Sequence, residues 1–95
     1  MSKIYPKVMD IRWRYDGENN QYITYLNPRT NNINILNPVA ARIFELCDAK
    51  HTKEEIIDRI FNEFEVPTKE IVKGDVEDFL QFMHKDKMIL LLKDS

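Results

Sequence analysis

The chain has 95 residues, of which 43% are hydrophobic and 32% charged, and its net charge is −2. This length suits one domain, residues 1–95, with a single modest core. The composition argues against a disordered chain, and the charge gives no general attraction to nucleic acid or anionic membranes. One cysteine cannot form an intrachain disulfide. Because no segment has the length of a signal-peptide core or a membrane span, we expect a cytoplasmic protein.

The first part of the chain alternates as β-strands do. In residues 7–15, apolar and charged side chains fall on opposite faces, and residues 21–26 are rich in β-branched and aromatic types. Turn-forming Asp, Gly and Asn residues separate these segments from each other and from residues 32–36. In that third segment isoleucines alternate with asparagines, the pattern of a half-buried strand. We therefore predict an antiparallel meander of three strands.

The hydrophobic period then becomes helical. Asn37 is a favourable N-cap and Pro38 suits the first helical position, which predicts a helix of about ten residues. A capping box at Thr52 opens a second helix, and Thr68 caps a third. Residues 88–92 are apolar and look extended, so we favour a closing strand or an irregular packed segment there over a continuation of the third helix. Strands followed by helices predict an α+β fold with the helices on one side of a small sheet.

The asparagine-rich third strand is predicted to lie at an edge of the sheet. An edge strand has unpaired backbone groups that can accept another chain, and the third helix would form the wall of the resulting groove. Ile71 and Phe82 broaden the apolar stripe of that helix. In the alternative interpretation, Ile71, Phe79 and Phe82 are ordinary core residues and the asparagines only protect the edge from aggregation. The edge can also pair with a second copy, which makes a homodimer a further alternative.

Catalytic and metal chemistry have little support in the sequence. Cys47, His51 and His84 are the candidate nucleophile and bases, and no motif joins them. Cys47 falls on the apolar stripe of the first helix, which favours a buried structural thiol. Two glycines, Gly17 and Gly74, are too few for a phosphate-binding loop. We predict no catalytic residue, no metal site and no cofactor.

DNA binding is the rival hypothesis, because the second and third helices are compatible with a helix-turn-helix. Residues 68–86 contain three basic and five acidic side chains, a net charge of −2 that would repel phosphates. A winged-helix DNA-binding or scaffold module is therefore the alternative, and a gel-shift series across salt would distinguish it from a peptide-binding module.

Several segments together resemble the PqqD-like family, the recognition elements for ribosomally made and later modified precursor peptides. The resemblance spans residues 10–91, although the segment before Asp10 matches nothing specific and Pro38 replaces a residue that is commonly not proline. The segments are Ile11-Arg12-Trp13, residues 22–25, Ile35-Leu36-Asn37 with residues 40–48, Thr52 to Ile56, Asp75-Val76, Phe79-Leu80 and Lys87-Met88-Ile89.

This resemblance implies a winged-helix-like fold in which a three-stranded antiparallel sheet is followed by three helices. It implies a non-catalytic peptide chaperone that binds the leader of a precursor peptide as an added strand and presents it to a modifying enzyme, often of the radical S-adenosylmethionine (SAM) type. Nucleic acid and membranes are not expected partners, and the pathway stays open among quinone-cofactor, sactipeptide-like and lasso-peptide types. The peptide-binding residues it implies are Asn32, Ile33, Asn34, Ile35 and Leu36 on the third strand and Val72, Asp75, Val76, Phe79 and Phe82 on the third helix.

Overall fold

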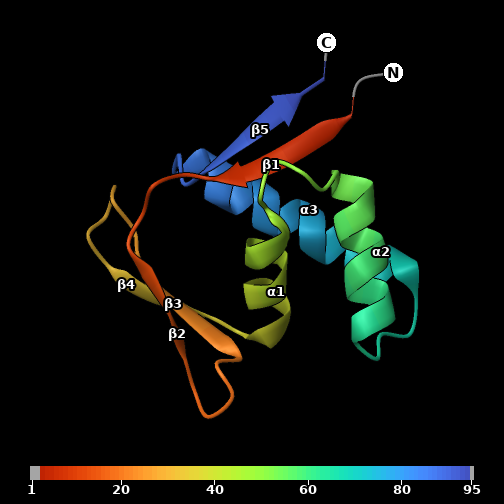
Figure 1. The fold of residues 1–95 in the computed structure, drawn as a ribbon, viewed down its shortest axis with the longest axis horizontal. Coiled ribbons are helices and arrows are strands. Elements are labelled where there is room, and N and C mark those ends of the chain that lie inside the picture. Colours follow the sequence, from red (N-terminus) through yellow and green to blue (C-terminus); the bar gives the residue numbers. More distant parts are fainter. Residues whose placement is uncertain (1–2, 95) are drawn as a thin grey trace.

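Four strands precede the helices and one follows them in the structure, a computed structural model that describes residues 3–94 (Figure 1). The first four strands are β1 (Ile4–Val8), β2 (Trp13–Asp16), β3 (Tyr22–Leu26) and β4 (Ile33–Leu36). Three helices follow within the described residues, α1 (Pro38–Leu46), α2 (Lys53–Glu63) and α3 (Lys69–Lys85), and β5 (Ile89–Lys93) completes the fold. The predicted α+β class, the three helices and the closing strand are confirmed. No helix within residues 3–94 combines the length and the apolar character needed to cross a membrane.

The strands form two separate antiparallel sheets. One has the order β2-β3-β4, as predicted, and the other pairs β1 with β5. The prediction of a single first strand over residues 7–15 is wrong, because the backbone changes partners between β1 and β2. The Met9 N–H donates to the Met88 carbonyl at 2.9 Å, whereas the Arg12 carbonyl accepts from the Leu26 N–H at 2.9 Å. The N-terminal segment, which lies outside the part of the chain that resembles the PqqD-like family, thus contains the partner strand of β5.

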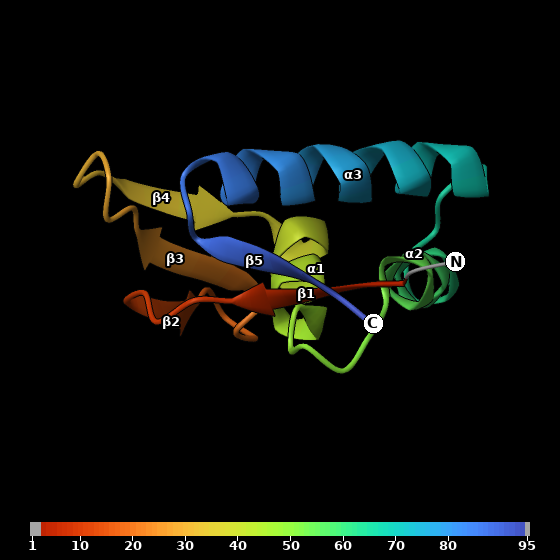
Figure 2. The same ribbon diagram turned by 90° about the horizontal axis from the view of Figure 1, so that it is seen from above.

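Helix α3 lies along one side of the molecule, with α1, α2 and the strands on its other side (Figure 2). The core fills the space between α3, the inner faces of the sheets and the other two helices. All three helices, both sheets and the turn before β5 contribute side chains that are at most 1% exposed. These include Ile23, Ile43, Ile56, Ile60, Val72, Val76, Met83, Met88 and Ile89.

Each helix begins at the cap that the sequence predicts. The Asn37 side chain accepts the N–H of the residue three positions ahead at 2.8 Å, and Thr68 caps α3 in the same way. Thr52 and Glu55 form a reciprocal capping box, with hydrogen bonds of 3.1 and 2.8 Å. Such caps stabilise a helix by about 1 kcal/mol each, so local chemistry sets the helix starts.

The turn between β3 and β4 contains a β-bulge. Asn31 has a φ of 65°, in the left-handed region that asparagine tolerates better than most residues. Its N–H donates to the Asn27 carbonyl at 2.8 Å, and the Asn27 N–H donates to the Asn32 carbonyl at 2.9 Å. This is the hydrogen-bond pattern of a G1 bulge, which inserts one residue and so sets the register of the following strand.

The resulting register places the isoleucines of β4 on the outer face of the sheet. Asn34 and Leu36 lie opposite buried residues of β3 and share their inner face. Ile33 and Ile35 are therefore on the outer face, where they are 72% and 67% exposed. The alternating pattern predicts the wrong residues of β4 as buried. The register set by the bulge, and not the apolar pattern, determines which face of the strand is turned toward the core. The pairs are Ile23–Leu36, Thr24–Ile35, Tyr25–Asn34 and Leu26–Ile33.

Candidate functional site

Strand β4 is an edge strand. In the three-stranded sheet it neighbours only β3, and β5, the one strand that follows the helices in residues 3–94, pairs with β1 instead. Figure 1 shows β1 and β5 side by side at a distance from β4. The chain that the structure describes therefore leaves the outer edge of β4 open to another backbone.

Two residues of β4 direct their backbone groups to this open edge. Residues of an antiparallel strand alternate between bonding one neighbour and the other. Because Asn32 accepts from Asn27 on the β3 side, the same alternation directs Asn34 and Leu36 toward β3. Ile33 and Ile35 then point their N–H and C=O groups outward. An incoming strand would meet two donors and two acceptors there.

One flank of α3 faces the β4 side of the molecule. Residues spaced three or four positions apart share one side of a helix, and this flank of α3 carries Ile71, Asp75, Asp78 and Phe82. Ile71 is 48% exposed and Phe82 54% exposed, which is high for such large apolar side chains. Figure 2 shows β4 and α3 running in opposite directions, with the C-terminal half of α3 nearer to β4.

A hollow joins this flank to the end of β4. It is lined on α3 by Asp75, Asp78 and Phe79, and on the other side by Asn37 and the first turns of α1. Since Asn37 directly follows the last residue of β4, the hollow begins where the open edge of β4 ends. Phe79 is half-buried and packs against the core while forming part of this surface.

Two of the ten predicted site residues lie in the core instead. Val72 is 1% exposed and Val76 is 0% exposed, so neither side chain can contact a peptide on the surface. They belong to the inward stripe of α3, while the outer flank is offset by about one residue around the helix. The other predicted residues, Asn32, Ile33, Asn34, Ile35, Leu36, Asp75, Phe79 and Phe82, lie on β4, in the turn before it, or on the α3 flank and hollow.

A cluster of hydrogen bonds that the sequence pattern did not predict connects the β3–β4 turn to the end of α3. Asp86, the C-cap of α3, accepts from Asn27 Nδ2 at 2.8 Å and from Arg29 Nε at 2.7 Å. The hydrogen bond from Arg29, followed by that from Asn27, lowers the pKa of Asp86. A negative charge at a helix C-terminus interacts unfavourably with the helix dipole. The position of Asp86 is therefore the one signal in the sequence that could have indicated a compensating partner for its carboxylate.

Residues 24–89 match the family model described as coenzyme PQQ synthesis protein D (PqqD). The chain belongs to the PqqD family. The matched span contains the last three residues of β3, all of β4 and the three helices of the described structure, and so the whole of the candidate site. The expected family, and the fold it implied, are therefore confirmed.

A solved structure supports the same assignment for this PqqD-family protein. The structure of TbiB1 in complex with the TbiA(beta) leader peptide is similar, with a TM-score of 0.68 and 25% sequence identity. The similarity covers 87% of this chain and 93% of the TbiB1 chain. No curated protein sequence matches this chain significantly.

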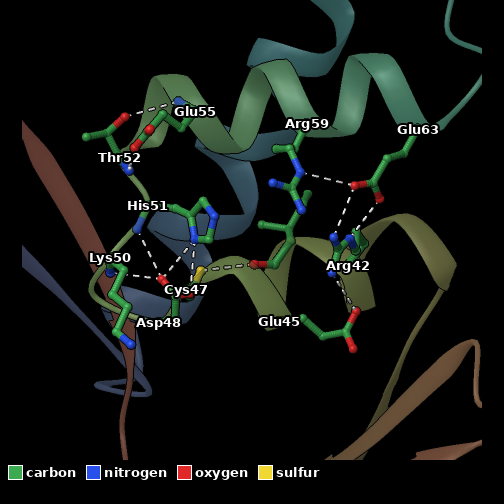
Figure 3. Close-up of polar contacts among 11 residues, drawn as sticks. Arg42, Glu45, Cys47, Asp48, Lys50, His51, Thr52, Glu55, Arg59 and Glu63 are labelled. Atoms are coloured by element: carbon green, nitrogen blue, oxygen red, sulfur yellow. Dashed lines mark hydrogen bonds and ion pairs between the residues drawn. The ribbon is translucent and has the colours of Figure 1, made fainter.

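Polar clusters elsewhere in this PqqD-family protein have structural roles (Figure 3). The Cys47 thiol donates to the Ile43 carbonyl at 3.2 Å, and burial raises its pKa to about 12, so it stays protonated and is a poor nucleophile. His51 contacts Asp48, which also accepts backbone N–H groups of the α1–α2 loop. In residues 3–94, no three His, Cys, Asp or Glu side chains are grouped so as to hold a metal ion.

Ion pairs hold α1 against α2 on the side away from the hollow. Arg42 donates to both carboxylate oxygens of Glu63, at 2.7 and 3.0 Å, and also contacts Glu45. Tyr15 on β2 donates to Glu45 at 2.6 Å. These contacts connect β2 to α1 and α1 to α2.

Proposed function

We propose that this protein binds the leader region of a ribosomally made precursor peptide as an added strand on β4. The observation that carries the proposal is the outward direction of the Ile33 and Ile35 backbone groups beside an exposed apolar flank of α3. Membership of the PqqD family and the similarity to TbiB1, which was solved with a leader peptide, support it.

In this proposal the protein is a non-catalytic chaperone that presents the leader to a modifying enzyme of the radical SAM type. The proposed contact surface consists of the β4 edge and the hollow with its adjoining α3 flank. It keeps Asn32, Ile33, Asn34, Ile35, Leu36, Asp75, Phe79 and Phe82 and adds Ile71 and Asp78.

The energetics explain why both the edge and the α3 flank are required. Four backbone hydrogen bonds at about 1 kcal/mol each give about 4 kcal/mol, which only offsets the lower estimate, about 4 kcal/mol, for the translational and rotational freedom lost on association. A micromolar Kd therefore needs about 8 kcal/mol from apolar burial, or about 320 Å² at 25 cal/mol per Å². Phe82 and Ile71 on α3 and the two isoleucines on β4 are the exposed apolar side chains that can supply it.

A pair of proline substitutions tests the strand addition. Ile35→Pro removes an outward N–H that bonds nothing in the sheet, so the fold should persist while peptide affinity falls at least about tenfold. Asn34→Pro removes an inward N–H that bonds β3, so it should lower the free energy of unfolding by about 1 kcal/mol or more. Fluorescence anisotropy with synthetic leaders from short reading frames beside the gene gives the affinity, and urea unfolding gives the stability.

The two variants act as controls for each other, because they place the same residue at adjacent positions of one strand. Unchanged peptide affinity in a folded Ile35→Pro protein would contradict strand addition on β4. Chemical-shift changes confined to a different surface would contradict it as well.

The same edge can receive β4 of a second copy, so the proposal includes a weak homodimer that the peptide displaces. Sedimentation velocity at increasing protein concentration, with and without peptide, measures this competition. DNA binding is not proposed, because the outer flank of α3 carries Asp75 and Asp78 and would repel phosphates.

A further inference from the structure

The open edge of β4 continues into a hollow with an unusual combination of side chains. Val39, Ala40 and Phe79 make its walls apolar, and Asp75 and Asp78 place two carboxylates at its border. The hollow adjoins the end of β4 at which the chain enters α1. A strand docked along β4 and extended past that end would therefore pass over it.

The two carboxylates have no cation of their own within residues 3–94. Neither Asp75 nor Asp78 takes part in an ion pair of that part of the chain, whereas Glu77 on the opposite flank of α3 pairs with Lys53 at 2.9 Å. Arg42 of α1 is already bound by Glu45 and Glu63.

Two other positive groups are too weak or too distant to neutralise the hollow. The α1 N-terminus contributes the equivalent of about half a positive charge, and the Asn37 side chain already accepts one of its N–H groups. Lys85 lies about one helical turn beyond Phe82, at the end of α3 that points away from the hollow. The hollow thus keeps a negative charge next to apolar walls.

Building on the proposed function, we infer that the docked peptide carries a lysine or arginine that reaches Asp75 and Asp78, together with a nearby apolar residue that packs on Phe82. Phe82 is four residues from Asp78 and seven from Asp75, or about 6 to 10 Å along the helix at 1.5 Å per residue. An extended peptide advances about 3.3 Å per residue. The basic and apolar residues are therefore two or three positions apart, with the basic residue on the α1 side. The ligand class is a basic–apolar leader segment.

Selection from a displayed library of random twelve-residue peptides tests this inference at low salt. We expect enriched peptides to contain a Lys or Arg two or three positions from a large apolar residue. Selection against the Asp75→Asn, Asp78→Asn double variant should lose the basic residue but keep the apolar one. The matched control is Glu54→Gln, Glu65→Gln, which makes the same charge change on and after α2, at two residues that do not line the hollow.

A synthetic peptide from the selection then provides the quantitative test. Neutralising the two aspartates should weaken its binding about 3- to 10-fold at low salt, as expected for exposed ion pairs, and less at high salt. Replacing the basic residue of the peptide by glutamine should cause the same loss in the wild-type protein and no further loss in the double variant.

The failure of this inference is distinguishable from the failure of the proposed function. Enriched peptides that shift the β4 amide signals but show no basic residue, or that bind the double variant equally well, would overturn the basic–apolar assignment and leave strand addition intact. Absence of any enriched peptide that shifts the β4 amides would overturn both.

Discussion

At the scale of single residues, exposure separates the candidate site from the rest of the surface. Isolated apolar side chains are common on protein surfaces and need no explanation. Ile33 and Ile35, however, are the most exposed large apolar side chains in the described chain, and they share one face of an open strand. Phe82 and Ile71 share one flank of the neighbouring helix. Together with the unpaired backbone groups at the β4 edge, these exposed apolar side chains form a surface that can bind an extended peptide.

Cys47 provides a prediction at the same scale. Its pKa is raised from 9.0 to about 12, first by burial and then by the charge of Asp48. We expect no reaction with a thiol reagent in the native protein at mildly alkaline pH and complete reaction in concentrated guanidinium. Above pH 9 only the unfolded thiol ionises, so its contribution to the free energy of unfolding, fully present below that pH, should decline between about pH 9 and 12.

Urea unfolding across this pH range, compared with Cys47→Ala, isolates that contribution, because the variant keeps the other groups that titrate there. Rapid labelling of the folded protein would show that the thiol is accessible and contradict the structural assignment.

At the scale of elements, the hairpin of β3 and β4 determines what the site can do. The bulge at Asn31 decides which face of β4 is buried and which backbone groups point outward. Asp86 then joins the turn of this hairpin to the end of α3 through Asn27 and Arg29. The edge and the helix flank are therefore held together before any peptide arrives, which reduces the entropy lost on binding.

Substitutions at Asn31 test the role of the bulge. Its φ of 65° is unfavourable for a residue with a Cβ and no local polar group, so Asn31→Ala should lower the free energy of unfolding by about 1 kcal/mol. Asn31→Gly should leave it unchanged or raise it slightly, because glycine adopts this φ freely. Urea unfolding of the two variants measures the difference. Equal stabilities would mean that the left-handed conformation does not set the turn.

At the scale of the whole molecule, the two sheets have different structural roles. The β1–β5 sheet joins the ends of the described chain and closes the core behind α3, while the β2-β3-β4 sheet keeps one edge open. Had β5 returned beside β4, the same elements would form a continuous sheet with no site there. The open edge is a consequence of this topology.

Peptide binding should therefore stabilise the native state as a whole. A ligand that binds only the folded protein adds about 2.7 kcal/mol at a concentration of 100 times Kd, which for a domain of this size raises Tm by about 10 to 20 °C. Differential scanning fluorimetry with increasing leader peptide measures the shift, and the Ile35→Pro protein should show little of it. A Tm that stays constant at saturating peptide would contradict binding to the folded state.

The sequence by itself determined the features that depend on neighbours three or four residues away. The caps at Asn37, Thr52 and Thr68 predicted the starts of the three helices, and the apolar stripe of α1 predicted a buried Cys47. Turn chemistry predicted two of the three strands of the larger sheet, and the order of these motifs carried the family resemblance. Such features are local, and the side chains that stabilise them are adjacent in the chain.

Only the tertiary structure decided the pairing of β1 with β5, which joins residues as far apart as Ile4 and Lys93. It also decided that Val72 and Val76 lie in the core and that Ile33 and Ile35 face outward. Strand pairing across the whole chain depends on how the helices return it, and a shift of one residue at a bulge exchanges the two faces of a strand. Neither effect leaves a periodic signal in the sequence. The asparagines could indicate an edge strand, but the tertiary structure decided that the edge stays open and which of its faces is buried.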